Sequence, residues 1–315
     1  MLPLTVRRTA RRLGVGRMLV RVHALRALTL PGAITLVHDR PRYLGRILEA
    51  TPIPAGEGPL EVHMLLHHER ILEGIWALYS FAHFAPTACQ MFVHSDGSLT
   101  ASDAAQLHRV LPAATVISRS DADNQVETEL HARGLHASLR FRRELIFALK
   151  LFDPFAFGDR PEFVLLDSDV LFFRAPCELT APTEANLYSP DNGYRYCLNP
   201  QDLREILGRE CIPAFNPGVI RVKRSVLDFQ KVEQYLQRAE FWGSGSRPHY
   251  YAELTLWAML LTSAGARPLP ASYAITPSLD GESPVSGHFC GGGYPSTWFY
   301  SRGLPHLAAE FGLMA

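Results

Sequence analysis

Hydrophobic and polar residues along the first half of the chain follow two different periods, in alternating blocks. Short apolar runs predict strands at 61–66 (EVHMLL), 90–94 (QMFVH) and 115–118 (TVIS). Apolar residues that recur every three to four positions predict helices at 70–84, from the cap Ser102 to Val110, at 121–133 and at 138–152. Strands that alternate with helices favour βαβ units. We therefore predict an α/β protein with a mainly parallel sheet flanked by helices.

The longest apolar run, Pro161–Pro176 (PEFVLLDSDVLFFRAP), carries two carboxylates in its middle. Its composition is typical of a strand buried on both faces, and we predict one continuous strand at 163–173. Asp167 and Asp169 then project from one side, and Ser168 faces the opposite layer. Because buried charges normally pair or hold a metal, the spacing predicts a site for Mn²⁺ or Mg²⁺. The alternative is that the aspartates cap backbone amides or meet arginines.

Polar side chains lie at the carboxyl ends of three apolar strand segments: His67, Asp96 and Asp167. Ligands of open parallel sheets bind beyond the carboxyl ends of the strands. We therefore predict that His67 and Asp96 contact the base or ribose of a nucleotide, and that Asp167 and Ser168 belong to the same binding site. Helix capping and turn formation are the alternative roles for His67 and Asp96.

Two cations precede the carboxylate run. Arg143 and Lys150 lie seven residues apart in the helix predicted at 138–152, so one helix face can carry both. A divalent metal held by carboxylates usually completes its shell with an anionic ligand such as a diphosphate. We predict that Arg143 and Lys150 offset phosphate charge, and a solvated helix face is the alternative.

The second half of the chain is less regular. The pattern predicts a helix at 202–209, a strand at 215–222, a helix from the cap Ser225 to about Phe241, an apolar helix at 250–262 and a loop-rich end at 277–305.

Two of these elements carry candidate chemistry. Asn216 and Gly218 open the strand at 215–222, where Asn216 either hydrogen-bonds a polar substrate that Gly218 lets approach or forms an Asx turn. Glu253 lies near the start of the apolar helix. Facing inward, it is a candidate catalytic base, acceptor anchor or charge stabiliser; facing outward, it is an ordinary exposed carboxylate.

His288 opens a glycine-rich loop (HFCGGG) near the end of the chain. It is a candidate third metal ligand, and imidazole beside carboxylates would favour Mn²⁺ over Mg²⁺. The backbone amides of Gly291–Gly293 are candidates to approach phosphate oxygens. Alternatively, His288 is an ordinary polar loop residue, and the three glycines only make the loop flexible.

Composition narrows the class of protein. The 315 residues are 47% hydrophobic and 20% charged with zero formal net charge, which is globular and does not favour nucleic acid as a partner. The odd number of cysteines without CxxC spacing indicates reduced thiols rather than zinc or disulfides. No stretch approaches the ~20 apolar residues of a membrane span. We expect a cytoplasmic protein.

Residues 1–26 hold seven arginines and no acid. The segment suits either a solvated arm or a basic amphipathic helix that gives the protein peripheral contact with an anionic membrane.

Three segments together resemble a known family. FVLLDSDVLFF resembles the DxD strand of metal-dependent glycosyltransferases with the GT-A fold. FNPGVIRV and HFCGGG resemble the Asn-x-Gly-Val strand and the His-Phe-x-Gly segment of the retaining glycogenin and lipopolysaccharide galactosyltransferase group. The resemblance covers roughly 60–305. It implies that Asp167, Asp169 and His288 hold a metal bound to the diphosphate of a nucleotide sugar, and that Asn216 contacts the donor sugar.

Two positions depart from that group. The group commonly has a lysine shortly after the His-Phe-x-Gly segment, where this chain has only Arg302 nearby. It often has an acid-Gln pair where this chain has Glu253-Leu254.

The resemblance implies a hexosyltransferase that moves a sugar from a nucleotide diphosphate donor, a UDP-sugar, to a hydroxyl of a glycan, lipid or protein acceptor with retention of configuration. We predict a basic arm and connector at 1–58 and a GT-A domain at 59–315, with a nucleotide-binding part at 59–176 and an acceptor and sugar part at 177–315. The alternatives are a sugar nucleotidyltransferase and a non-catalytic nucleotide-sugar-binding module.

Overall fold

The computed structural model describes residues 35–54, 56–243, 248–277, 279, 281–290 and 297–314. The basic segment at 1–26 and Gly291–Gly293 lie outside the described residues. The strands are β1 (Leu60–Leu66), β2 (Cys89–Ser95), β3 (Thr115–Ile117), β4 (Glu162–Leu166), β5 (Val170–Phe172), β6 (Leu187–Pro190), β7 (Phe215–Lys223), β8 (Arg267–Pro268), β9 (Tyr273–Ile275) and β10 (Ser286–His288).

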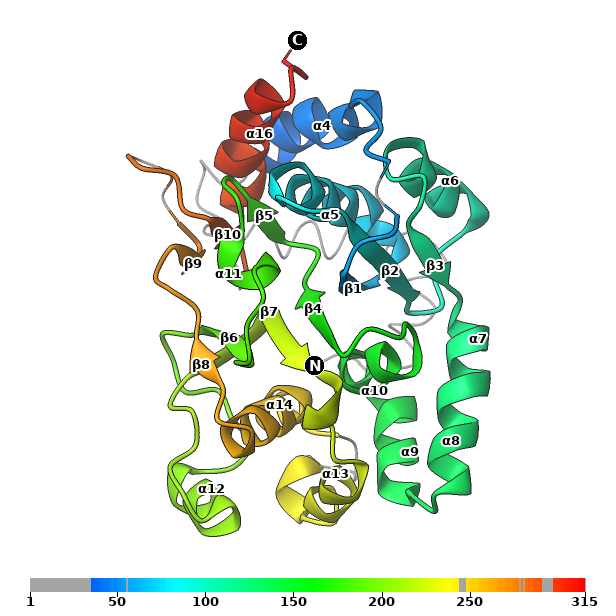
Figure 1. The fold of residues 1–315 in the computed structure, drawn as a ribbon, viewed down its shortest axis with the longest axis vertical. Helices are drawn as coiled ribbons and strands as arrows, with labels where there is room; N and C mark the ends of the chain where they lie inside the picture. Colours follow the sequence, from blue (N-terminus) through cyan, green and yellow to red (C-terminus); the bar gives the residue numbers. More distant parts are fainter. Residues whose placement is uncertain are drawn as a thin grey trace.

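These strands form two sheets (Figure 1). The large sheet has the order β3-β2-β1-β4-β7-β6-β8, in which β3, β2, β1 and β4 run parallel and β7 is antiparallel to both β4 and β6. The small sheet has the order β5-β10-β9. The prediction of an α/β protein with a mainly parallel sheet is therefore confirmed.

Helices connect the strands. The α-helices are α4 (Arg40–Tyr43), α5 (Ile71–Phe84), α6 (Ala101–Val110), α7 (Arg119–Ala122), α8 (Thr128–Ala132), α9 (His136–Glu144), α10 (Leu149–Ala156), α11 (Cys177–Thr180), α12 (Pro200–Leu207), α13 (Phe229–Tyr235), α14 (Ala252–Ser263) and α16 (Leu304–Glu310). The 3₁₀ and π segments are η1 (Thr35–Asp39), η2 (Leu44–Glu49), η3 (His68–Arg70), η4 (Asp123–Glu127), η5 (Ile146–Ala148), η6 (Arg224–Val226), η7 (Ala239–Phe241) and η8 (Phe299–Gly303).

Two predicted helix caps are wrong. Thr100, not Ser102, caps α6: its side chain accepts from the Asp103 amide, and the Asp103 carboxylate accepts from the Thr100 amide. Asp228, not Ser225, caps α13 by accepting from the Lys231 amide. The helix predicted from Ser225 to Phe241 is consequently shorter.

The helix predicted at 138–152 is also wrong as a single element. Leu145 is extended and separates α9 from the helical run of η5 and α10. Arg142, fully buried on α9, donates to Asp153 on α10 at 2.8 and 3.0 Å. The interruption places Arg143 and Lys150 on different helices.

Alternate residues of the central strands face two hydrophobic cores. Val164 and Leu166 of β4 pack on the side covered by α5, α6, η2 and α16. Phe163 and Leu165 pack on the side covered by α9, α10, α13 and α14 (Figure 1). Part of the predicted connector belongs to the first core, because Leu44 and Ile47 of η2 are buried there.

The predicted continuous strand at 163–173 is wrong, and the error lies at the aspartates. β4 ends at Leu166, residues 167–169 form a turn, and β5 joins the small sheet. The Val170 amide donates to the Asp167 carbonyl at 3.2 Å across this turn. Both apolar halves of the run are buried, but in different sheets, because the two carboxylates interrupt the apolar surface that a single buried strand requires.

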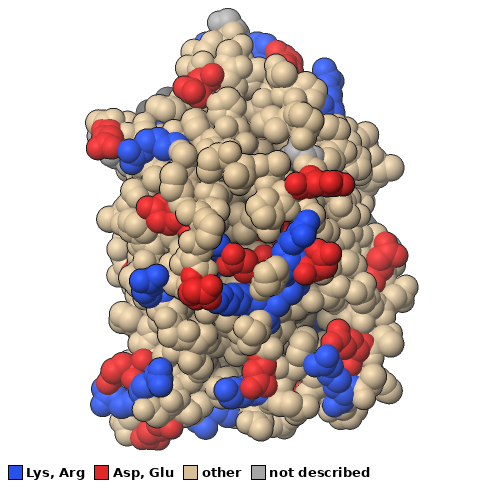
Figure 2. Space-filling view, viewed as in Figure 1, with Lys and Arg blue, Asp and Glu red and all other residues tan. Residues whose placement is uncertain are grey.

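None of the described helices is long and apolar enough to cross a bilayer. Figure 2 shows Lys and Arg side chains interspersed with Asp and Glu over the face that it draws.

Candidate functional site

The turn between β4 and β5 lies at the carboxyl edge of the parallel strands. Its first residue, Asp167, donates its amide to the carbonyl of Gly218 on β7 at 2.9 Å. Ser168 is half-buried between the two aspartates. Main-chain pairing therefore holds the start of the turn against the large sheet.

Pairing in the small sheet brings His288 to the same turn. His288 on β10 lies opposite Val170 on β5, and the Phe289 amide donates to the Asp169 carbonyl at 2.9 Å. The His288 Nε2 atom lies 3.0 Å from Asp169 Oδ1 and 3.9 Å from Asp167 Oδ2. Two residues of one turn and a third far along the sequence thus face a common point.

One potential ligand atom from each of Asp167, Asp169 and His288 lies within 4.8 Å of the others. Within the described part of the chain, this is the one group of three or more His, Cys, Asp and Glu side chains close enough to hold a metal ion together. Two carboxylate oxygens and an imidazole suit a divalent cation such as Mn²⁺. The residues present fit the metal that the sequence predicts.

The charges of the cluster stabilise one another. Burial opposes the ionisation of Asp169, but the charge and hydrogen bond of His288 outweigh it and lower the pKa of that carboxyl. Burial also opposes protonation of His288, and Asp169 outweighs it and raises the pKa of the imidazole well above its usual value. A cation that replaced the imidazolium proton would meet the carboxylate of Asp169 in the ionised form that its lowered pKa favours.

Gly218 makes room for the histidine. A Cβ atom at this position would lie 2.2 Å from His288 Cε1 and 2.3 Å from Nδ1. The sequence predicts close approach at Gly218 by a substrate, whereas the structure places the imidazole of His288 there.

Lys150 and Glu253 lie beside the turn and are both buried. Lys150 Nζ is 2.7 Å from Asp167 Oδ1. Burial alone would lower the pKa of Lys150, but Asp167 and then Glu253 outweigh it and raise this pKa. Burial raises the pKa of Glu253 to about 7, against the influence of Lys150, and its Oε1 atom has no hydrogen-bond partner among the described residues. Glu253 therefore faces inward, as one of its two predicted orientations requires.

Asn216 is buried next to the cluster and shows the Asx geometry. Its Oδ1 atom accepts from the Gly218 amide at 2.9 Å, and its Nδ2 atom donates to Asp191 Oδ2 at 3.1 Å. It also lies 3.7 Å from the Cys290 thiol. These contacts fix the entry of β7, and a role toward substrate stays a prediction.

His67 and Asp96 share one edge of the sheet, because β1 and β2 are parallel and Leu66 pairs with Ser95. The Asp96 amide donates to the Leu66 carbonyl at 3.1 Å, and its carboxylate accepts from Ser98. A nucleotide-binding role for either residue stays a prediction.

The structure also places a cation here that the sequence reasoning missed. This cation is Arg70, in η3 shortly after β1. Burial raises the pKa of Asp169, His288 outweighs that effect, and the charge of Arg70 lowers this pKa further. Its guanidinium lies 3.4 Å from Tyr300 Oη and 3.9 Å from Glu73 Oε1. The available signal was a basic residue within four positions of the end of a strand that leads to the ligand edge of the sheet.

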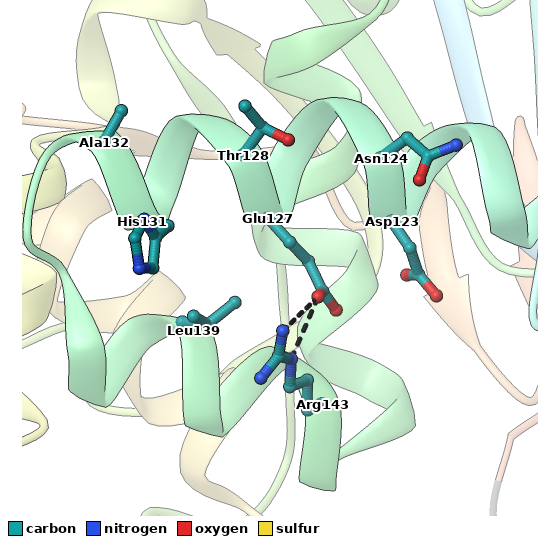
Figure 3. A pocket seen from close by; sticks show the side chains of 8 residues that line it. All are labelled: Asp123, Asn124, Glu127, Thr128, His131, Ala132, Leu139 and Arg143. Atoms are coloured by element: carbon teal, nitrogen blue, oxygen red, sulfur yellow. Dashed lines mark hydrogen bonds and ion pairs between the residues drawn. The ribbon is translucent and has the colours of Figure 1, made fainter.

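Arg143 does not join this group. It lines a surface pocket of about 410 Å³ between η4, α8 and α9, where it pairs with Glu127 at 2.6 Å (Figure 3). Its predicted partnership with Lys150 on one helix face is wrong, because α9 ends before Lys150.

No protein-family model matches the sequence, and no curated protein matches it either. The fold is similar to two solved glycosyltransferase structures. One is the galactosyltransferase LgtC in complex with donor and acceptor sugar analogs, with a TM-score of 0.51 and 14% identity over 80% of this chain and 96% of that one. The other is the bifunctional glycosyltransferase WbbM in its apo form, with a TM-score of 0.51 and 13% identity over 83% of this chain and 52% of that one.

These likenesses identify the fold as GT-A, the class predicted from the sequence. At this level of identity they establish the architecture, and the reaction has to be argued from the site.

Proposed function

We propose that this chain is a metal-dependent glycosyltransferase that moves a sugar from a nucleotide diphosphate donor to an acceptor hydroxyl. The observation that carries the proposal is the convergence of Asp167, Asp169 and His288 at the carboxyl edge of the parallel strands. Nucleotides bind at this edge in open α/β sheets. UDP as the donor nucleotide and retention of configuration come from the family resemblance and are part of the proposal.

In this proposal Asp167, Asp169 and His288 hold Mn²⁺ or Mg²⁺. The bound cation supplies Lewis-acid assistance, by neutralising charge on the departing diphosphate. Lys150 keeps its positive charge although it is buried, and Arg70 adds a second positive charge beside Asp169. Both cations favour the negative charge of the leaving group in a partly desolvated site.

Asn216 and Glu253 line the sugar side of the site. Asn216 is held by Gly218 and Asp191, so its position is set before any substrate binds. Glu253 carries an oxygen without a partner and a pKa raised to about 7 by burial, so it can accept a hydrogen bond from a substrate hydroxyl or take up its proton. We propose that Glu253 orients the sugar or the acceptor.

The experiment measures release of nucleoside diphosphate with Mn²⁺ and a panel of nucleotide sugars. Transfer or donor hydrolysis is expected. Formation of nucleotide sugar that depends on pyrophosphate would instead indicate a nucleotidyltransferase, and saturable binding without turnover would indicate a binding module.

Asp169→Ala tests the metal ligands. We expect turnover to fall at least about 100-fold with the fold retained, because a ligand is lost from the site. Asp159→Ala removes an exposed carboxylate and should leave turnover unchanged. Full activity of the Asp169 variant would overturn the proposed metal site.

A further inference from the structure

Three side chains from distant segments gather round the buried carboxylate of Glu73 on α5. Glu73 is 1% exposed, and its Oε1 atom accepts from Tyr300 Oη at 2.8 Å and from Arg40 Nη2 at 3.2 Å. The same oxygen lies 3.9 Å from Arg70 Nη1, which also donates to Tyr300 Oη at 3.4 Å. The hydroxyl of Tyr300 therefore links Arg70 to the carboxylate.

This cluster holds more positive than negative charge. Two guanidinium groups share the carboxylate of Glu73, which leaves an excess of one positive charge. Arg40 is the closer of the two, and its Cζ atom also lies 5.6 Å from the centroid of the Tyr300 ring. Arg70 is the more loosely paired arginine, and its side chain is 42% exposed. An anion that reached Arg70 would supply the opposite charge that Glu73 cannot supply to both arginines.

The cluster adjoins the turn that carries the metal-ligand candidates. Because β1 and β4 are adjacent parallel strands, η3 with Arg70 and the turn with Asp169 both leave the carboxyl edge of the sheet. The Phe289 amide donates to the Asp169 carbonyl at 2.9 Å, and the Phe289 ring meets Phe299 of η8 edge to face with centroids 5.8 Å apart. Tyr300 is the next residue, so one short series of contacts connects Asp169 to the support of Arg70.

We propose that Glu73 and Tyr300 are positioning residues, which hold the guanidinium of Arg70 where it binds an oxygen of the substrate diphosphate. The inference rests on the proposed function, because it adds residues to the binding of that same donor. A guanidinium has enough N–H groups to donate to Tyr300 and to a phosphate at once. Arg40 shares the charge of Glu73 and so keeps this carboxylate from neutralising Arg70. Part of the predicted connector at 1–58 thereby supports the site.

The first experiment is calorimetry of UDP and of inorganic pyrophosphate at saturating Mn²⁺. Arg70→Gln should lower the affinity for both about 10- to 100-fold, the range of a hydrogen bond between charged groups. Arg70→Lys keeps the charge without the planar group and should lose less. Arg42→Gln removes an exposed arginine of α4 and should leave both affinities unchanged.

The positioning role is tested by Tyr300→Phe, which removes the hydroxyl and keeps the ring that Arg40 faces. The affinity for both probes should fall about three- to tenfold, the range of one neutral hydrogen bond. Affinity for Mn²⁺ without nucleotide, followed by electron paramagnetic resonance, should not fall in Tyr300→Phe or Arg70→Gln, because Arg70 is a cation beside the metal-ligand candidates. An equal fall in Mn²⁺ affinity would indicate a damaged fold and would overturn the assigned roles.

These measurements separate the inference from the proposed function. If pyrophosphate affinity depends on Arg70 while no nucleotide sugar is turned over, the arginine binds diphosphate and the proposed transferase activity fails. If nucleotide sugars are turned over and Arg70→Gln binds both probes with wild-type affinity, the transferase stands and the inference is wrong. A loss confined to UDP would assign Arg70 to the base or ribose, and this result, or binding of neither probe to the wild type, would also overturn the inference.

Discussion

Gly218 offers the sharpest test of the metal site, because changing it alters the site without removing a ligand. In Gly218→Ala the new Cβ would lie 2.2 Å from Cε1, 2.3 Å from Nδ1 and 2.9 Å from Nε2 of His288. Carbon atoms in contact lie about 3.5–4.0 Å apart, so the imidazole has to move by more than about 1 Å. The ring is buried and its Nε2 atom is 3.0 Å from Asp169, so that movement breaks the shared ligand geometry.

We expect the affinity of Gly218→Ala for Mn²⁺ to fall about 10- to 100-fold, the range found when the support of a metal ligand is lost. This corresponds to roughly 1.4–2.7 kcal/mol of binding free energy. Overpacking should also lower the free energy of unfolding by about 1–3 kcal/mol.

The assay is a Mn²⁺ titration followed by the electron paramagnetic resonance signal of the free ion, with thermal melting in parallel. Gly45→Ala is the matched control, because a Cβ there meets no heavy atom within 4 Å. The reasoning is refuted if folded Gly218→Ala binds Mn²⁺ with wild-type affinity, or if the Gly45 variant loses affinity to the same extent.

The remaining predictions concern buried charges. Lys150→Met should tighten Mn²⁺ binding severalfold, because a cation 2.7 Å from Asp167 is removed, and weaken UDP binding about tenfold in calorimetry; a parallel loss of both would contradict the assigned role. The pKa of Glu253, raised to about 7, means that the folded protein holds a proton that the unfolded chain releases near pH 4.5. Stability from this group therefore falls between pH 4.5 and 7, and the melting temperature of Glu253→Gln relative to wild type should rise over that range. Burial lowers the pKa of His63 to about 4. Burial would raise the pKa of Glu61, but hydrogen bonds from His63 and from the Arg160 and Asp159 amides, together with the charge of Arg224, lower it to about 2. Both groups thus stabilise the fold at neutral pH, and urea unfolding should show stability lost from pH 6.5 to 4 through His63 and from 4.5 to 2 through Glu61, with the upper part absent in His63→Phe.

The metal-ligand candidates could be named from the sequence, although the geometry assigned to them was wrong. Asp167 and Asp169 stand out because charge inside a long apolar run requires a partner, whichever element carries it. The apolar pattern cannot show that the run changes sheets between β4 and β5, because both halves are buried. His288 could be named as a candidate from its place at the start of a glycine-rich loop, and the family resemblance strengthened that prediction. Its position beside the aspartates could not be predicted, because the pairing of β10 with β5 joins residues far apart in the sequence.

Predictions from local periodicity were wrong where contacts between distant parts of the chain decide the structure. The helix break at Leu145 could not be predicted, because no proline or glycine stands there. The break separates Arg143 from Lys150, and Arg142 faces inward and pairs with Asp153. The cation Arg70 was missed because its relation to Asp169 depends on the parallel pairing of β1 with β4.

The origin of each part of the site suggests how substrate choice and metal binding can vary separately. Main-chain pairing of β4, β5, β7 and β10 positions Asp167, Asp169, His288 and the glycine beside them. Of the side chains that face substrate in our proposal, Asn216 comes from β7, whereas Lys150 and Glu253 come from α10 and from the start of α14. Because α14 takes no part in that strand pairing, substitutions at Glu253 should change substrate binding more than Mn²⁺ affinity. Substitutions at the strand pairing should impair every donor and acceptor alike.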